Sequence, residues 1–175
     1  GGPAFSGWAT NAHHCMEKHF DWWAADKSFD VYQEITNLPE GTYTLTAQAF
    51  HREGDHGTSS TNVYPEMYAT NGSSTTKTVK VCSINDASAP ATKPNNMTEA
   101  GAAFVNGSYN VTLSSVTVGK DGKLRIGIRN TTTVDTRLWC CFNNFQLLYH
   151  GTAQGDLKGT ELYRSVKAAA EEAQA

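Results

Sequence analysis

Residues 29–50 read FDVYQEITNLPEGTYTLTAQAF, and this stretch decides the fold class. In residues 42–50, Tyr, Leu and Ala alternate with Thr and Gln. Side chains of a strand point alternately to its two faces, so this period of two predicts a half-buried strand with a core face and a wet face. Residues 29–35 predict a second strand. Between them Pro39 fixes φ and Gly41 tolerates a positive φ, which predicts a sharp turn and hence a β-hairpin.

Strand-like runs continue along most of the chain. Five further runs have the alternation or the β-branched content of strands, at residues 67–70, 77–84, 109–118, 123–129 and 145–149. Asn96, with Glu99 three residues on, predicts the N-cap of one short helix. About eight strands at hairpin-like spacing predict an all-β jelly-roll sandwich of antiparallel strands with one short inserted helix. The residues expected in its core are Tyr43, Leu45, Ala47, Leu124, Ile126, Ile128, Phe145 and Leu147.

The two ends of the chain differ from the middle. Residues 1–27 have no clean period and are rich in aromatic residues and His, so we expect a loop with one short strand. From residue 156 the sequence is weakly amphipathic, and its last residues are Ala- and Glu-rich helix formers. We therefore expect a sandwich at 1–150 and, at 151–175, a C-terminal helical extension that starts a linker or a further domain.

The composition excludes some classes of partner. Of the 175 residues 18% are charged, and the formal net charge is −3 at pH 7. Without an excess of Lys and Arg, the chain has no positive field for a nucleic-acid backbone. No apolar run is long enough to span a bilayer. We expect neither a nucleic-acid partner nor membrane insertion.

The four cysteines, Cys15, Cys82, Cys140 and Cys141, lack the paired spacing of a zinc site. Cys140 and Cys141 are neighbours in a strand-like run and are expected to point to opposite faces, so they cannot both serve one bridge. We interpret the cysteines as buried thiols, with a disulfide between Cys15 and Cys82 as the alternative.

Several runs, taken in order, resemble a known family. They are FDVYQEI (29–35), LPEGTY (38–43), AQAFHR (47–52), GKLRIGI (122–128) and NNFQL (143–147), together with Trp139. They are similar to the galactose-binding-like β-sandwich modules of secreted and surface proteins of Bacteroidetes-type gut bacteria. This resemblance implies a jelly roll, an extracytoplasmic location (secreted, periplasmic or cell surface) and carbohydrate binding. Two positions depart from the pattern, because the family often has Tyr where His51 stands and Asp where Asn144 stands.

Sugar recognition needs flat aromatic faces and planar polar groups. Residues of these types at expected loops or strand ends are Trp22, Trp23, His51, Arg52, Tyr64 and Trp139, and we predict these as ligand-binding residues. Trp22 and Trp23 are adjacent, so in an extended backbone one of them is expected to face a groove or solvent. The alternative interpretation is that the tryptophans close the ends of the sandwich.

No cofactor is certain from the sequence. The histidines lack convincing metal-ligand spacing, so a transition metal is a weak hypothesis. A structural calcium ion is better supported, because carboxylates that can supply hard oxygens occur in expected loops, at Asp21, Asp26, Glu53 and Asp55.

Catalysis is weakly indicated. Glu53 and Asp55 are the pair of carboxylates that a glycosidase would need, but they lie in one polar loop, where solvated charge is the default explanation. Arg125 and Arg129 fall on the wet face of their strand, and we interpret them as solubilising residues.

Together these patterns favour a non-catalytic carbohydrate-binding module of a secreted or surface multidomain bacterial protein, with a glycan and the neighbouring domains of its own chain as partners. The alternative is a structural spacer or docking module that packs against neighbouring domains without binding sugar. An exposed Trp beside a concave surface would favour the first hypothesis, and a large flat apolar patch at the sandwich edge would favour the second.

Overall fold

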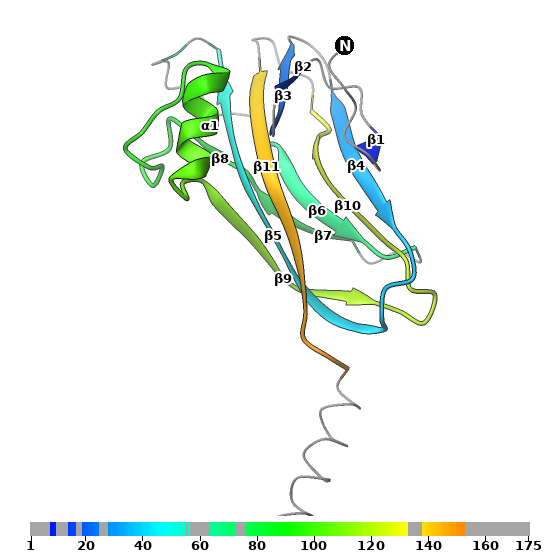
Figure 1. Ribbon diagram of the computed structural model, residues 1–175. Coiled ribbons are helices and arrows are strands. Elements are labelled where there is room, and N and C mark those ends of the chain that lie inside the picture. The colour runs from blue at the N-terminus through cyan, green and yellow to red at the C-terminus, as the bar shows by residue number, and fades with distance from the viewer. Residues whose placement is uncertain are drawn as a thin grey trace, which may run out of the picture.

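A computed structural model describes residues 8–9, 14–16, 19–24, 28–54, 56, 64–72, 76–132 and 138–152. Up to residue 24 it describes the backbone alone. Two β-sheets pack face to face, and one short helix lies beside one of them (Figure 1). The predicted β-sandwich with an inserted helix is confirmed.

The first sheet, called sheet A here, orders its strands β1, β4, β10, β6 and β7, and all its pairings are antiparallel. The strands are β1 (Trp8–Ala9), β4 (Phe29–Ile35), β6 (Glu66–Thr70), β7 (Thr76–Lys80) and β10 (Leu124–Asn130). The predicted strand-like runs at 67–70 and 77–84 contribute β6 and β7, which pair with one another.

The second sheet, sheet B, contains β2 (His14–Met16), β3 (His19–Ala24), β5 (Gly41–Glu53), β8 (Cys82–Ser83), β9 (Asn110–Val118) and β11 (Leu138–Tyr149). β5 lies beside β11 along one edge. Along its other edge it pairs first with β9, antiparallel, and then with β8, parallel. The thirteen-residue β5 is therefore the strand that joins three others.

Residues 29–35 and 42–50 are strands as predicted, but the predicted hairpin between them is wrong. β4 belongs to sheet A and β5 to sheet B, so the turn carries the chain from one sheet to the other. The turn is held by Tyr43, whose hydroxyl donates to the Pro39 carbonyl at 2.7 Å, and by Leu38, whose N–H donates to the Gly122 carbonyl at 3.0 Å. Local turn chemistry bends the chain but does not choose the strand with which the next one pairs.

The predicted N-cap of the helix is confirmed. Helix α1 (Met97–Val105) begins after Asn96, whose side-chain oxygen accepts the Glu99 N–H at 2.9 Å. The phase of β9 slips where Ser115 has a φ of 57°, opposite a register shift in β5. A bulge of this kind leaves apolar residues on the core face on both sides of the slip.

The prediction of a single short strand in residues 1–27 is wrong, since three short strands lie there. β1 pairs with β4, and β2 and β3 extend sheet B beyond β11. β1 and β3 are placed by pairing with strands that are distant in sequence, which a local period cannot report. The expected helix at 151–175 lies outside the described residues, apart from 151–152.

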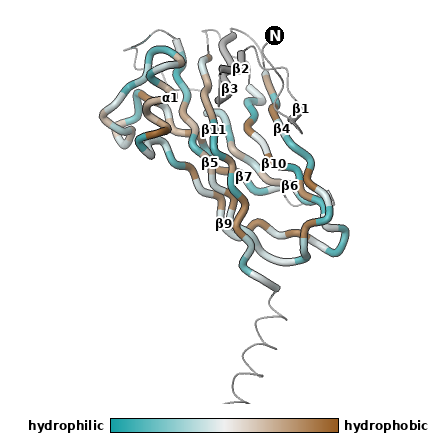
Figure 2. Tube along the Cα trace, in the orientation of Figure 1, coloured by the Kyte–Doolittle hydropathy of each residue, from teal (hydrophilic) through white to brown (hydrophobic). Residues whose placement is uncertain are grey.

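The core between the sheets contains the apolar positions predicted from the alternation, and hydropathy alternates along the strands in Figure 2. Tyr43, Leu45 and Ile126 are each at most 3% exposed. Phe145 and Leu147 correct the prediction, because they are only partly buried against this core. They follow the irregularity of β11 at Asn144, where φ is 56° and the register with β5 shifts.

A second apolar cluster lies on the outer face of sheet B. Phe50 and Trp139 from the sheet pack there against Ala100, Ala103 and Phe104 of α1. The Phe50 ring centroid is 5.6 Å from that of Phe104 and 5.2 Å from that of Trp139. Figure 1 shows α1 beside β5 and β8, on the side of the molecule away from β4. α1 therefore covers this part of the outer face of sheet B.

The two adjacent cysteines of β11 point in opposite directions, as predicted. Cys140 belongs to the core between the sheets and Cys141 to the cluster under α1. Cys82 is a free thiol, so the alternative of a disulfide with Cys15 is not present.

We predict that Leu45→Ala or Ile126→Ala lowers the free energy of unfolding by ~2–5 kcal/mol, because each removes a buried side chain from a packed core. Chemical denaturation followed by tryptophan fluorescence measures the loss. Thr112→Ala, on the exposed face of β9, is the control and is expected to change stability by less than ~0.5 kcal/mol. Wild-type midpoints in both core variants would contradict this assignment of the core.

Candidate functional site

The predicted site residues divide between the two faces of β5. His51 continues the inner face of the strand and is 0% exposed. Its ring lies edge-on to the half-buried ring of Tyr64, with centroids 5.2 Å apart, and the Tyr64 hydroxyl donates to Asp86 at 3.1 Å. Neither ring nitrogen of His51 has a hydrogen-bond partner among the described residues. Burial lowers the pKa of His51 to about 4, although the negative charge of Asp86 opposes the change.

Arg52 and Trp139 lie on the opposite face of the same strand pair. Arg52 is 7% exposed, and its guanidinium lies 4.9 Å from the centre of the Trp139 ring. Its Nη1 donates to Asn95 at 2.6 Å and its Nε to the Gly54 carbonyl at 3.0 Å. Trp139 is 5% exposed, because Phe50 and Arg52 cover it. In this arrangement the two side chains join the loop before α1 to sheet B.

The structure thus brings the predicted residues together in two pairs, His51 with Tyr64 and Arg52 with Trp139, separated by the sheet itself. Trp22 and Trp23 belong to β3, but their side chains lie outside the described residues. Their ligand-binding role stays a prediction.

The structural calcium ion stays a prediction, because two of the carboxylates expected to bind it, Asp26 and Asp55, lie outside the described part of the chain. Within that part, no group of three or more His, Cys, Asp or Glu side chains is placed to hold a metal ion.

The outer face of sheet A carries a ladder of charged and aromatic side chains. In register across the sheet, Gly127 lies between Tyr32 and Tyr68. Arg125 lies over the Tyr32 ring at 4.3 Å and Arg129 over the Tyr68 ring at 4.7 Å. A Cβ at position 127 would lie 2.4 Å from the Val31 carbonyl oxygen and 3.0 Å from Tyr32 Cβ and Tyr68 Cε1, so this close approach of β4 and Tyr68 to β10 requires glycine. Each ring therefore has an arginine against it.

Carboxylates accompany this ladder. The Tyr68 hydroxyl donates to Asp30 at 2.8 Å, and burial together with this hydrogen bond raises the pKa of Tyr68. Arg129 lies 3.6 Å from Glu66. Sheet A therefore presents a polar outer face in which positive and negative side chains alternate.

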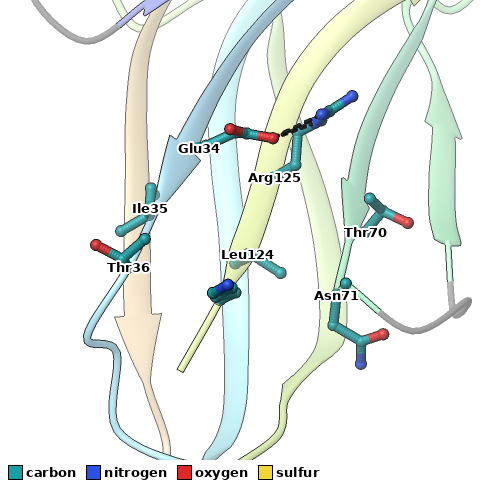
Figure 3. A pocket seen from close by; sticks show the side chains of 9 residues that line it. Glu34, Ile35, Thr36, Thr70, Asn71, Leu124 and Arg125 are labelled. Carbon is teal, nitrogen blue, oxygen red and sulfur yellow. Dashed lines mark hydrogen bonds and ion pairs between the residues drawn. The ribbon is translucent and has the colours of Figure 1, made fainter. Parts of the chain in front are cut away.

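At the end of this face where β4 and β6 stop and β10 begins, there is a hollow of about 420 Å³. Its lining comes from these three strand ends and consists of Glu34, Ile35, Thr36, Thr70, Asn71, Gly72, Lys123, Leu124 and Arg125. Figure 3 shows Glu34 and Arg125 pointing toward one another, with Thr70 and Asn71 on the neighbouring strand end. The volume is within the usual range of small-ligand sites, which starts at ~300 Å³.

The ion pair in the hollow has unused hydrogen-bonding capacity. Arg125 donates to the same oxygen of Glu34 from Nη2, at 2.6 Å, and from Nε, at 3.2 Å. This hydrogen bond raises the pKa of Arg125. The other carboxylate oxygen of Glu34 and Nη1 of Arg125 have no partner among the described residues. An acceptor and a donor held side by side match two neighbouring hydroxyl groups, one donating and one accepting.

Sequence analysis missed this hollow and interpreted Arg125 as solubilising. Glu34 and Arg125 are 91 residues apart and become neighbours only through the register of β4 with β10. The alternation of β10 places Arg125 on the wet face, but nothing local indicates which side chain lies across from it.

One solved structure supplies a comparison at the level of the fold. It is described as TmCBM61 in complex with β-1,4-galactotriose, and the likeness has a TM-score of 0.51 and covers 83% of this chain and 90% of that one. The fold is like that of a carbohydrate-binding module. At 16% sequence identity the likeness shows the fold alone. In sequence, neither a known family nor a curated protein matches the chain. No helix in the described part is both long and apolar enough to cross a membrane.

We predict that His51 makes stability depend on pH. In the unfolded chain His51 takes up a proton below pH 6.5, whereas in the folded protein it does so only near pH 4. The contribution of His51 to the free energy of unfolding is therefore complete above pH 6.5 and is lost as the pH falls toward 4. A shift of this size corresponds to ~3 kcal/mol at ~1.4 kcal/mol per pH unit. Urea denaturation between pH 7 and 4 measures it. In His51→Gln this part of the pH dependence is expected to disappear, and parallel curves for the two proteins would contradict the prediction.

Proposed function

We propose that this chain is a non-catalytic carbohydrate-binding module of a secreted or surface-attached multidomain bacterial protein, and that it binds glycan at the hollow of sheet A. The observation that carries the proposal is the paired donor and acceptor of Arg125 and Glu34 inside a hollow of about 420 Å³. The fold, like that of a module solved with a galactotriose, supports the same class of ligand.

The neighbouring side chains suit a sugar ring. Thr36 lines the hollow with a hydroxyl group that can exchange hydrogen bonds with those of a sugar. Thr70 and Asn71 also line it, where the Thr70 hydroxyl is hydrogen-bonded to that of Thr76 and the Asn71 amide nitrogen donates to the Thr117 carbonyl at 3.2 Å. Ile35, which is only partly buried against the core, supplies apolar surface for the C–H side of the ring.

A binding role is favoured over hydrolysis, because the lining contains a single carboxylate, Glu34, which is paired with Arg125. Glycosidases use two carboxyl groups on opposite sides of the scissile bond.

A second candidate function is a docking or spacer module. The observation that favours it is the exposure of Leu148 (61%) and Tyr149 (44%) at the end of β11. A glycan-array screen distinguishes the two hypotheses, because a docking module is expected to give no hit on a broad array.

We predict that Arg125→Ala weakens binding of the best array ligand by ~1–3 kcal/mol, because the free Nη1 donor is lost together with the ion pair that holds Glu34 in place. Glu34→Gln is expected to weaken it as well. Isothermal titration calorimetry measures both. Arg129→Ala is the matched control, since Arg129 lies on the same strand and face, stacks on a tyrosine, forms an ion pair with a glutamate at 3.6 Å, and is not in the lining.

Equal losses in Arg125→Ala and Arg129→Ala would contradict the proposed position of the site. Trp22→Ala and Trp23→Ala extend the same experiment to the predicted aromatic residues. A loss of ~1–3 kcal/mol in those variants, with none in Arg125→Ala, would place the site at the tryptophans instead.

A further inference from the structure

The ion pair in the hollow leaves one acceptor and one donor free. Nε and Nη2 of Arg125 both donate to the same oxygen of Glu34, at 3.2 and 2.6 Å. The second oxygen of Glu34 and Nη1 of Arg125 have no partner among the described residues. Thr70 and Asn71, which also line the hollow, instead form hydrogen bonds to other side chains and to the backbone of β9 (Asn110–Val118). A ligand therefore meets an acceptor and a donor that belong to one ion pair.

This acceptor and this donor are held in place before a ligand binds. Glu34 and Arg125 lie directly opposite one another in the register of β4 with β10. Tyr32, two residues before Glu34 on β4, holds the guanidinium from a second direction, since the centre of its ring is 4.3 Å from the guanidinium carbon. Tyr32 is itself opposite Gly127, which has no side chain to keep Arg125 from this ring. Groups that are already fixed lose little conformational entropy on binding.

The charges around the hollow balance. Lys123 and Arg125 are its basic lining residues. Glu34 forms the ion pair with Arg125. The Asp121 carboxylate lies 3.4 Å from the position that a Cβ would take on Gly72, another lining residue, and accepts the Lys123 backbone N–H at 3.4 Å. Two basic and two acidic side chains thus lie in or beside the hollow, so recognition does not require a charged ligand.

We propose that the hollow selects uncharged glycan units by a free vicinal diol, that is, two hydroxyl groups on adjacent ring carbons. One hydroxyl donates to Glu34 and the other accepts from Arg125. This inference rests on the proposed function and narrows its ligand class.

A vicinal diol divides glycans by their linkage. An internal unit linked through O1 and O4 keeps its O2 and O3 hydroxyls, which are on adjacent carbons. An internal unit linked through O1 and O3 keeps O2 and O4, which the linked carbon separates. The second kind of unit offers the same number of hydroxyls but cannot present two neighbouring ones to Glu34 and Arg125. The hollow is therefore expected to discriminate between linkage isomers of a single sugar.

An acetamido sugar also carries a donor and an acceptor, in its amide group. The N–H and C=O of a planar trans amide point in opposite directions, however. They cannot both reach an acceptor and a donor that lie on the same side of them. An internal 1,4-linked 2-acetamido unit keeps only its O3 hydroxyl besides O6, so it also lacks the diol. Units of this kind are expected to bind weakly.

The test is calorimetry with pairs of hexasaccharides that differ only in linkage. The β-1,4-linked hexamers of glucose, galactose and xylose are each compared with the β-1,3-linked hexamer of the same sugar, in which only the two end units retain a vicinal diol. At least one 1,4-linked hexamer is expected to bind about tenfold more tightly than its partner, because a hydrogen bond to a charged group is lost in the 1,3-linked isomer. Chitohexaose, built from 1,4-linked 2-acetamido units, is the third arm.

Variants connect the preference to the hollow. Glu34→Ala and Arg125→Ala each remove one of the two groups, and the preference is expected to fall below about twofold in both. Arg129→Ala is the matched control and is expected to keep the full preference, because Arg129 lies on the same face of β10 and is not in the lining.

Three results would overturn the inference: 1,4-linked hexamers that all bind within about twofold of their 1,3-linked partners, chitohexaose that binds as tightly as the best hexamer, or a preference that survives in Glu34→Ala and Arg125→Ala. After either of the first two results the proposed function still stands if Arg125→Ala weakens binding of the best ligand and Arg129→Ala does not. If no glycan binds at all, the proposed function fails together with the inference.

Discussion

The two-sided burial of β5 is the constraint on which the rest of the fold depends. One face of the strand supplies Leu45 to the core between the sheets, and the other supplies Phe50 to the cluster under α1. Its backbone pairs with β11 on one edge and with β9 and then β8 on the other. A one-residue slip would exchange the two sets of side chains, so register, helix position and sheet packing are fixed together.

The two-sided burial of β5 also determines which outer face of the sandwich is open to a ligand. Because α1 packs on Phe50 and Trp139, part of the outer face of sheet B is covered. The outer face of sheet A carries no such helix in the described part of the chain, and its strand ends form the hollow around Arg125. The buried pairs at the other end, His51 with Tyr64 and Arg52 with Trp139, have their packing partners inside the protein. In the described part of the chain, the polar outer face of sheet A is therefore left open to a ligand.

The sequence was informative wherever the determining interaction was local. The alternation at Leu45 and Ile126 predicted their burial, and Asn96 with Glu99 predicted the start of α1. It failed where pairing at a distance decides the structure, as in the connection between β4 and β5. The candidate site belongs to this second class, since Arg125 meets Glu34 only through the register of β10 with β4. Residue type alone predicted ligand-binding roles for aromatic residues such as Trp139, which the structure shows to be buried.

The most direct test of the account is an amide chemical-shift map of the isotopically labelled protein titrated with the glycan that binds best. The account predicts that the perturbed amides cluster at the strand ends around Glu34, Asn71 and Arg125, and that β5 near His51 stays unperturbed. Perturbations confined to β3 and the His51 end of β5, with none around Arg125, would contradict it.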